Sequence, residues 1–148
     1  MIVGIHHVAV SVPDLAAGLA FYSGLLGFEA VERAEIDGRS RDVDRAIGLD
    51  GVEARMAMLR APNAFIELWE YRQPAPVDRT ARPCDLGYPH LALQVRDIEA
   101  EYERLLAGGM QFVGEPVDFG TASAIYGRDP FGNVVELYEI RDARTAQL

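Results

Sequence analysis

Two histidines and two glutamates recur at matched places in this chain, and all four carry side chains that bind metals. His7 and His90 each open a short alternating run that reaches an aspartate seven positions later. Glu67 and Glu136 are the second residues of two further matched runs, Ile-Glu-Leu-Trp-Glu and Val-Glu-Leu-Tyr-Glu. Repetition of this kind indicates a duplicated structural unit. The matched ligands therefore predict a metal centre to which each copy contributes one imidazole and one carboxylate.

The four side chains predict one divalent ion, because two carboxylates that converge without a cation repel each other and one becomes protonated. Nitrogen and oxygen ligands suit Ni²⁺, Co²⁺, Mn²⁺, Fe²⁺, Zn²⁺ or Mg²⁺, and the sequence does not choose among them. Cys84 is the only cysteine, which excludes a disulfide within the chain and a cysteine-based zinc site. Four protein ligands in a six-coordinate shell leave two places for water or substrate, which is typical of a catalytic site.

Other residues beside the ligands receive different predictions. His6 has no counterpart in the second copy, where Pro89 stands, and strand alternation places it on the face opposite His7. Glu70 and Glu139 are repeated, but alternation places them away from the ligand face, where we expect them to supply charge near a strand end. Trp69 and Tyr138 are aromatic residues on the ligand face. Two interpretations stay open for them: they line a substrate cleft, or they pack in the core.

The elements that must position these residues follow the same duplication. Each histidine begins a strand of alternating residues, and each aspartate that follows starts a helix with an apolar stripe. The remaining strands are predicted at 29–36, 54–60, 64–71, 111–117, 123–128 and 134–140. The turn residues of 129–133 predict a hairpin between the last two strands. Each half is therefore a βαβββ module, and the fold class is α+β, with two tandem modules forming a curved sheet around a shared metal cleft.

The predicted organisation is a first module at 1–73, a proline-bearing linker at 74–86 and a second module at 87–148, in one compact domain overall. The first module is longer by 14 positions between its histidine and its glutamate. The extra residues fall at 37–53, a polar stretch. Two interpretations stay open for this stretch: a lid or specificity element over the site, or a tolerated surface insertion.

The overall composition favours a globular protein that acts on a small molecule. The chain has 148 residues and a formal net charge of −9, which argues against nucleic acids and anionic membrane surfaces as partners. It has no run of eighteen apolar residues and no basic, cleavable leader, so we expect neither a transmembrane helix nor a signal peptide. We expect a cytoplasmic location.

Beyond these patterns, the whole chain resembles the vicinal oxygen chelate superfamily, also called the glyoxalase, bleomycin-resistance and dioxygenase group. The residues that carry the resemblance are the opening at 7–14, Phe21-Tyr22 and Leu26-Gly27-Phe28 behind it, the second opening at 90–92, and the run 129–136. The resemblance implies paired βαβββ modules, a homodimer, and one divalent metal bound by His7, Glu67, His90 and Glu136.

The resemblance also implies a metal-dependent lyase or isomerase of the glyoxalase or epimerase type. Such an enzyme removes a proton alpha to a carbonyl while the metal stabilises the resulting enolate. In the lyase mode the base is a metal-bound glutamate, Glu136 or Glu67. In the epimerase mode it is a separate carboxylate, for which Asp50 and Glu53 are weak candidates.

Other expectations concern the substrate and two alternative functions. Arg45, with Arg39 and Arg55, is a candidate for holding an anionic substrate tail. One alternative is an iron-dependent dioxygenase, which four ligands disfavour because such enzymes use a facial triad. The other is a small-molecule-binding resistance protein without catalysis, which typically lacks the four ligands.

Overall fold

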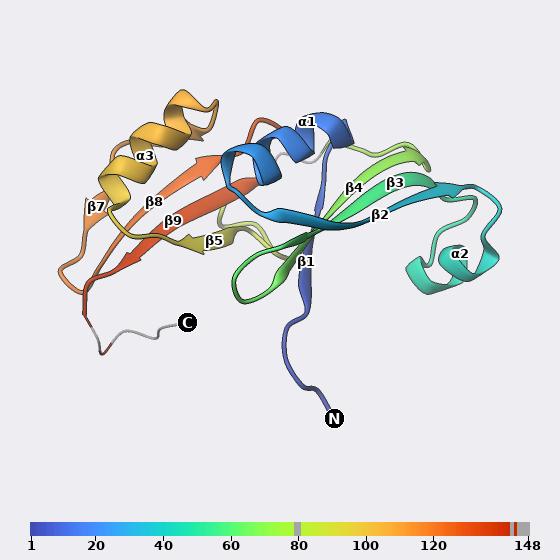
Figure 1. Cartoon of the computed structure of the whole chain (residues 1–148), viewed down its shortest axis with the longest axis horizontal. Helices are drawn as coiled ribbons and strands as arrows, with labels where there is room; N and C mark the ends of the chain where they lie inside the picture. The colour runs from blue at the N-terminus through green and yellow to red at the C-terminus, as the bar shows by residue number, and fades with distance from the viewer. Residues whose placement is uncertain (79–80, 143, 145–148) are drawn as a thin grey trace. The chain divides into compact units, whose positions relative to one another are not determined.

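The computed structural model describes residues 1–78, 81–142 and 144. The chain divides into two compact units, Met1–Asp78 (unit 1) and Arg79–Leu148 (unit 2). Each unit contains one sheet with a helix on one face, in the order strand, helix, strands (Figure 1). The predicted α+β class and the two βαβββ modules are confirmed. None of the helices in the described part of the chain is long and apolar enough to span a membrane.

The sheet of unit 1 has the strand order β1-β4-β3-β2. Its strands are β1 (His7–Ser11), β2 (Glu29–Asp37), β3 (Glu53–Arg60) and β4 (Phe65–Gln73). β1 runs parallel to β4, whereas the other neighbours are antiparallel. The first and last strands of the module are therefore neighbours, which brings the histidine of one beside the glutamate of the other.

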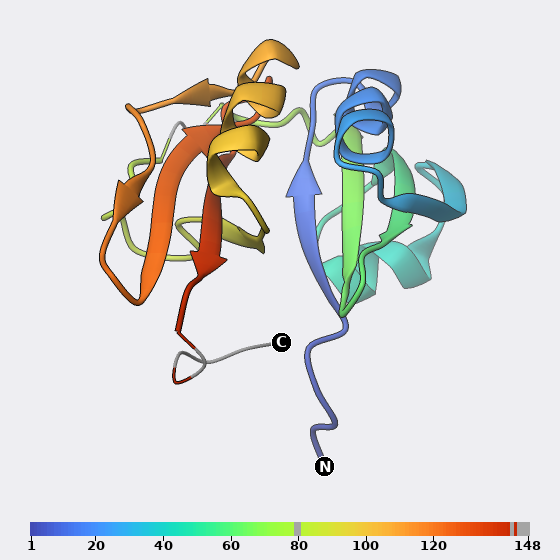
Figure 2. The same cartoon turned by 60° about the vertical axis from the view of Figure 1, so that its left-hand side comes forward.

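The helix of unit 1 begins where the sequence predicts it. Asp14 is the N-cap of α1 (Leu15–Leu19), and its carboxylate accepts a hydrogen bond from Ala17 N at 2.7 Å. The helix then widens into a π-helical turn, η1 (Ala20–Leu25), in which Leu26 N donates to Phe21 O. Buried side chains of this segment cover one face of the sheet, and Figure 2 shows α1 lying along it.

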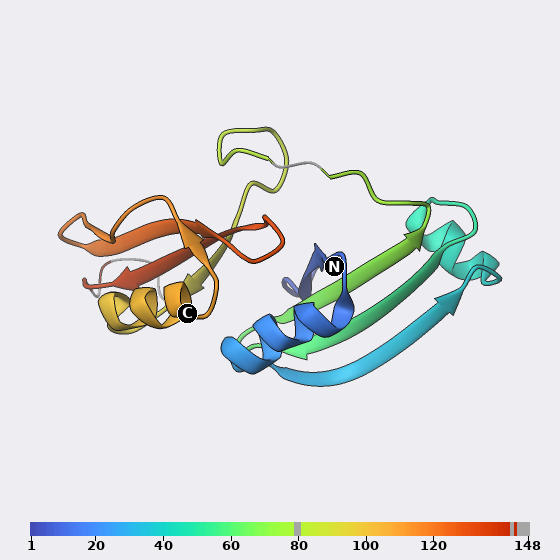
Figure 3. The ribbon, with the colours of Figure 1, turned by 90° about the horizontal axis from the view of Figure 1, so that it is seen from above.

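The insertion at 37–53 forms a short helix rather than an irregular loop. α2 (Arg41–Ile47) is capped by Ser40 at its start and by left-handed Gly48 at its end. The carboxylate of Asp44 accepts hydrogen bonds from Gly51 N and Val52 N, both at 2.9 Å. α2 has no buried residues, and it lies beyond the ends of β2 and β3 (Figure 3). Its own caps and Asp44 therefore hold the insertion in shape.

The sheet of unit 2 has the order β5-β9-β8-β6, and β7 also pairs with β8. The long strands are β5 (Leu91–Gln94), β8 (Ala122–Arg128) and β9 (Val134–Ile140), with β5 parallel to β9. The strand predicted at 111–117 is wrong as one element, because it is split into β6 (Gln111–Phe112) and β7 (Val117–Asp118). Gly114 and Pro116 lie in the gap, and proline has no N–H to donate to a ladder.

The helix and hairpin of unit 2 match the sequence predictions. Asp97 is the N-cap of α3 (Ile98–Ala107) and accepts a hydrogen bond from Ala100 N at 3.2 Å. The hairpin between β8 and β9 is closed by Asp129, whose carboxylate accepts hydrogen bonds from Phe131 N at 2.9 Å and Asn133 N at 2.8 Å. Because this turn fixes the antiparallel register, each residue of β8 has a defined neighbour on β9.

Candidate metal centre

The first histidine–glutamate pair lies on the face of the unit 1 sheet that its helix leaves open. His7 Nε2 is 3.5 Å from Glu67 Oε2. Ile66 and Leu68, on either side of Glu67, are buried under the helix, which confirms the predicted alternation of β4. Ala9, two residues after His7, is the direct neighbour of Glu67 on β1. The small alanine leaves room for the histidine and the carboxylate to meet diagonally across the two strands.

Unit 2 repeats this arrangement. His90 Nε2 is 3.2 Å from Glu136 Oε2. His90 directly precedes β5, and Ala92 is the neighbour of Glu136, as Ala9 is of Glu67. Val135 and Leu137 are buried on the opposite face. The two units therefore hold the predicted ligands in the same local geometry.

Each pair fits chelation of one cation. Two ligand atoms bonded to a common ion at about 2.0–2.2 Å, with about a right angle between them, lie ~3 Å apart. The separations of 3.5 and 3.2 Å between histidine nitrogen and carboxylate oxygen are close to this value. Taken by itself, neither unit has a cluster of three or more histidine, cysteine, aspartate or glutamate side chains in its described residues that would hold a metal. Each unit thus contains one histidine–glutamate pair that is a candidate bidentate half-site.

Trp69 lies on the open face beside the first pair. Its indole Nε1 donates a hydrogen bond to Glu67 Oε2 at 2.6 Å, and its ring stacks on Tyr71 with centroids 5.2 Å apart. Burial raises the pKa of Tyr71, and the nearby Glu67 carboxylate raises it further. Tyr138, at the matched place on β9, is half-buried on the open face of unit 2. A substrate contact by either residue stays a prediction.

Tyr126 is a residue of the second pair that the sequence analysis missed. It is the direct neighbour of Glu136 across the β8–β9 ladder, and its hydroxyl lies beside the Glu136 carboxylate. Its ring meets the His90 ring edge-on, with centroids 5.0 Å apart. Burial raises the pKa of Tyr126, as do the charge of Glu136 and the hydrogen bond to it. Counting outward from the hairpin at 129–133 pairs residue 126 with residue 136, so the signal was present in the sequence.

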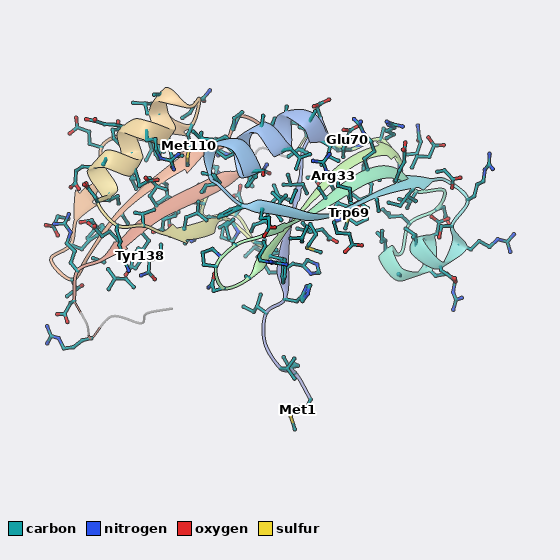
Figure 4. The ribbon with its side chains drawn as sticks, viewed as in Figure 1. Met1, Arg33, Trp69, Glu70, Met110 and Tyr138 are labelled. Atoms are coloured by element: carbon teal, nitrogen blue, oxygen red, sulfur yellow. The ribbon has the colours of Figure 1, made fainter. Side chains whose placement is uncertain are left out.

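The role predicted for Glu70 and Glu139, charge near a strand end, needs correction. Glu70, labelled in Figure 4, is only 7% exposed. Its Oε2 accepts a hydrogen bond from Leu15 N at 2.6 Å. Glu139 Oε1 accepts one from Asp97 N, also at 2.6 Å. Each carboxylate thus ties the last strand of its unit to the start of the helix. Alternation gave their face correctly, but it gave no sign of this contact.

His6 also differs from its prediction. Its ring stacks on Phe65, a half-buried residue two positions from Glu67, with centroids 5.0 Å apart. Its Nδ1 is 2.9 Å from Nδ1 of His7. Because β1 begins at His7, strand alternation does not govern His6. His6 is therefore a neighbour of the first pair rather than a residue of the opposite face.

The structure does not bring the candidate arginines and separate bases to the first pair. Arg45 is exposed on α2 and lies 3.6 Å from Asp42, and its substrate role stays a prediction. Arg55 lies on the helix side of the sheet, where its Nε donates a hydrogen bond to Glu70 Oε1 at 3.2 Å. Its guanidinium therefore pairs with Glu70 and not with a group on the open face. Glu53 is the first residue of β3, and Met58, five residues later on that strand, is the neighbour of Glu67. Five residues of a strand span about 16 Å, so Glu53 lies far from the Glu67 carboxylate. Asp50 is exposed just before that strand.

The fold of the two units is that of a known class of protein. The chain belongs to the Glyoxalase/Bleomycin resistance protein/Dioxygenase superfamily, whose family profile matches residues 4–137. The resemblance inferred from the sequence is thereby confirmed.

Within this superfamily, the chain is similar to an epimerase and to a glyoxalase family protein of known structure. The chain is 33% identical over 146 residues to a 2-epi-5-epi-valiolone epimerase from Actinomyces sp., covering 93% of this chain and 80% of the relative. The structure of a glyoxalase family protein from Bacillus cereus has a TM-score of 0.84 at 27% identity and covers 95% of both chains.

A more distant structure shares the fold. It is a variant of the fosfomycin resistance protein FosX from Listeria monocytogenes, complexed with Mn(II) and 1S,2S-dihydroxypropylphosphonic acid. Its TM-score is 0.60 at 20% identity, with 94% of this chain and 93% of that chain covered.

Proposed function

We propose that this chain is a divalent-metal-dependent epimerase, within the wider class of metal-dependent lyases and isomerases, that acts on a small ketone. The observation that carries the proposal is the pair of matched half-sites, each with a histidine nitrogen and a carboxylate oxygen at chelating distance. The epimerase relative supports the reaction type, and its name describes its substrate as a ketone. FosX supports a divalent ion, since that protein was crystallised with Mn(II).

In this proposal His7, Glu67, His90 and Glu136 bind one ion. A divalent cation bound there would supply Lewis-acid polarisation of a substrate carbonyl oxygen. The identity of the metal among Ni²⁺, Co²⁺, Mn²⁺, Fe²⁺, Zn²⁺ and Mg²⁺ is left to experiment. The histidines serve as neutral nitrogen donors, and the carboxylates supply both negative charge and a basic oxygen.

One carboxylate of the chain and water account for the proton movements of an epimerisation. Because Asp50 and Glu53 are not brought to the first pair, the base in this proposal is a half-site glutamate, Glu136 or Glu67, which takes the proton from the carbon next to the carbonyl. Water returns a proton to the opposite face of the same carbon and regains one from the protonated glutamate, so that one configuration is converted into the other. No redox partner is needed, because the atoms and charges of substrate and product are the same.

The proposed setting is a cytoplasmic homodimer that binds a small molecule. Size-exclusion chromatography with light scattering would test the dimer, and a mass of one chain, about 16 kDa, would contradict it.

The test is proton exchange at carbon. The protein is stripped with a chelator, reloaded with each metal in turn, and incubated in D₂O with 2-epi-5-epi-valiolone and other hydroxylated ketones. We expect deuterium at one carbon next to the carbonyl, followed by NMR, and a large loss of exchange in Glu136→Gln and Glu67→Gln. Arg60→Gln on the surface is a suitable control, since its recorded ion pair is with exposed Glu29.

Two outcomes would contradict the proposal. Tight ketone binding without deuterium exchange under any metal would indicate a binding protein of the resistance type. Oxygen consumption coupled to substrate loss would indicate a dioxygenase.

A further inference from the structure

Each half-site carboxylate has one aromatic hydrogen-bond donor. In unit 1 the donor is the indole N–H of Trp69, two residues along the same strand as Glu67. In unit 2 the phenol of Tyr126 is placed to donate to Glu136 from the neighbouring strand. Both aromatic residues lie on the open faces of their sheets, beside the glutamate that faces the histidine.

The two donors do not occupy matched places in the duplicated modules. Tyr138 stands where Trp69 stands in unit 1, and Met58 is the cross-strand neighbour of Glu67 as Tyr126 is of Glu136. Methionine has no hydrogen to donate. The βαβββ fold therefore does not by itself require a donor at either position. The two units share an aromatic donor beside the half-site carboxylate. In unit 1 the donor comes from the same strand as the glutamate, and in unit 2 it comes from the neighbouring strand.

A carboxylate on a strand can rotate about its side-chain bonds and present several lone pairs. A donor on a fixed ring limits this rotation. Trp69 is itself held, because its ring is stacked on Tyr71. Tyr126 is placed to constrain both members of its pair, since it lies directly across the ladder from Glu136 while its ring packs edge-on against His90. Such outer contacts orient metal ligands, and their loss typically costs about 10–100-fold in metal affinity.

We infer that Trp69 and Tyr126 are positioning residues that hold the Glu67 and Glu136 carboxylates in the orientation that binds the metal. The inference rests on the proposed metal site, and it assigns Trp69 a role other than substrate contact. Trp69 is also the only tryptophan in the chain, so its emission reports directly on the environment of the Glu67 carboxylate.

The experiment measures Zn²⁺ affinity of the full chain by competition with a chromophoric chelator. Trp69→Phe and Tyr126→Phe remove the donors and keep aromatic rings. Tyr102→Phe is the matched control, because Tyr102 lies on α3 and its ring contacts Phe112 rather than a half-site residue. We expect a loss of about 10–100-fold for each donor variant and no change for the control. In parallel, Zn²⁺ added to wild-type protein should change the Trp69 emission saturably, and Glu67→Gln should abolish this response.

A double-variant cycle separates positioning from general damage to the fold. In a Glu136→Gln background, Tyr126→Phe should cost much less affinity than in wild type, because the contact through which it acts is altered. Donor variants that bind Zn²⁺ as tightly as wild type would overturn the inference. So would an equal cost of Tyr126→Phe in both backgrounds. Failure of the proposed metal site gives a different result, since wild-type protein itself would then show no competition and no emission change.

Discussion

The Glu70 carboxylate accepts a hydrogen bond from the backbone N–H of Leu15 across 55 residues of sequence, at 2.6 Å. The bond joins the last strand of unit 1 to the first residue of α1. Glu139 makes the corresponding bond to Asp97 in unit 2. In each unit the anchoring glutamate follows the half-site glutamate by three positions. One short run of sequence in each unit therefore carries a half-site glutamate on one face of the sheet and, three residues later, a glutamate on the other face that bonds the start of the helix.

Glu70→Ala should lower the free energy of unfolding by about 1–3 kcal/mol. The substitution leaves the N–H of Leu15 without its partner and removes the acceptor of Arg55. Urea unfolding followed by circular dichroism measures the effect. Glu29→Ala is the control, because its ion pair with Arg60 is exposed and worth ~0–1 kcal/mol. Equal losses of unfolding free energy in the two variants would show that buried Glu70 contributes no more to stability than the exposed ion pair.

Glu70 should also shape the stability of the protein in acid. Burial raises the pKa of Glu70, but hydrogen bonds from Arg55 and Leu15 outweigh this, and the net pKa is lowered. A carboxylate with a lowered pKa in the folded state stabilises the fold above its unfolded pKa of about 4.3. This contribution is lost as the pH falls through the folded pKa. The unfolding free energy of wild type should therefore fall more steeply below about pH 4.5 than that of Glu70→Gln. Parallel slopes in denaturant titrations between pH 7 and 3 would contradict this.

Gly127→Ala should destabilise unit 2 by about 1–3 kcal/mol. An added Cβ would lie 2.8 Å from side-chain carbons of Met110 and Phe112 and 3.0 Å from Gln111 O. Gly114→Ala should have little effect, since nothing lies within 4 Å of the position of its Cβ. Thermal unfolding of the two variants provides the comparison. A Gly127→Ala protein as stable as Gly114→Ala would mean that Met110 and β6 shift easily to make room for the methyl group.

His6→Ala should weaken metal binding by about tenfold, while His7→Ala should abolish it. The two rings contact through their Nδ1 atoms, and a partner on one ring nitrogen of a ligating histidine fixes the orientation of the other. Competition titrations with Zn²⁺ on both variants measure the difference. If His6→Ala loses as much affinity as His7→Ala, then His6 is itself a ligand. If it loses none, the contact between the rings has no influence on the site.

Much of the fold was predictable because both modules show clear strand alternation and begin their helices at an aspartate. Alternation placed Ile66, Leu68 and Glu67 on their faces, and Asp14 and Asp97 marked the helix starts. Local signals sufficed for these features because each depends on residues close together in the chain. The insertion at 37–53 was located by its length, but its helix was not predicted, since it is capped by Ser40 and Gly48 and buries no apolar stripe.

The half-sites were predictable as residues but not as contacts. The repeat selected the two histidines and two glutamates, because duplication preserves their places. The partners of these residues depend on register between strands, which alternation alone does not give. Tyr126 required counting across a hairpin, and Glu70 required a contact between a strand and a helix start. His6 was misplaced because the strand begins one residue after it.

The most direct test of the account is metal stoichiometry in a matched set of variants. Wild type, His7→Ala with Glu67→Gln, and His90→Ala with Glu136→Gln are purified, reloaded and analysed by elemental analysis, with circular dichroism as the check on folding. The account predicts about one divalent ion per chain in wild type and close to none in either double variant, because one ion requires both half-sites. It is contradicted if wild type binds no ion after reloading, or if either double variant keeps the full ion with unchanged affinity.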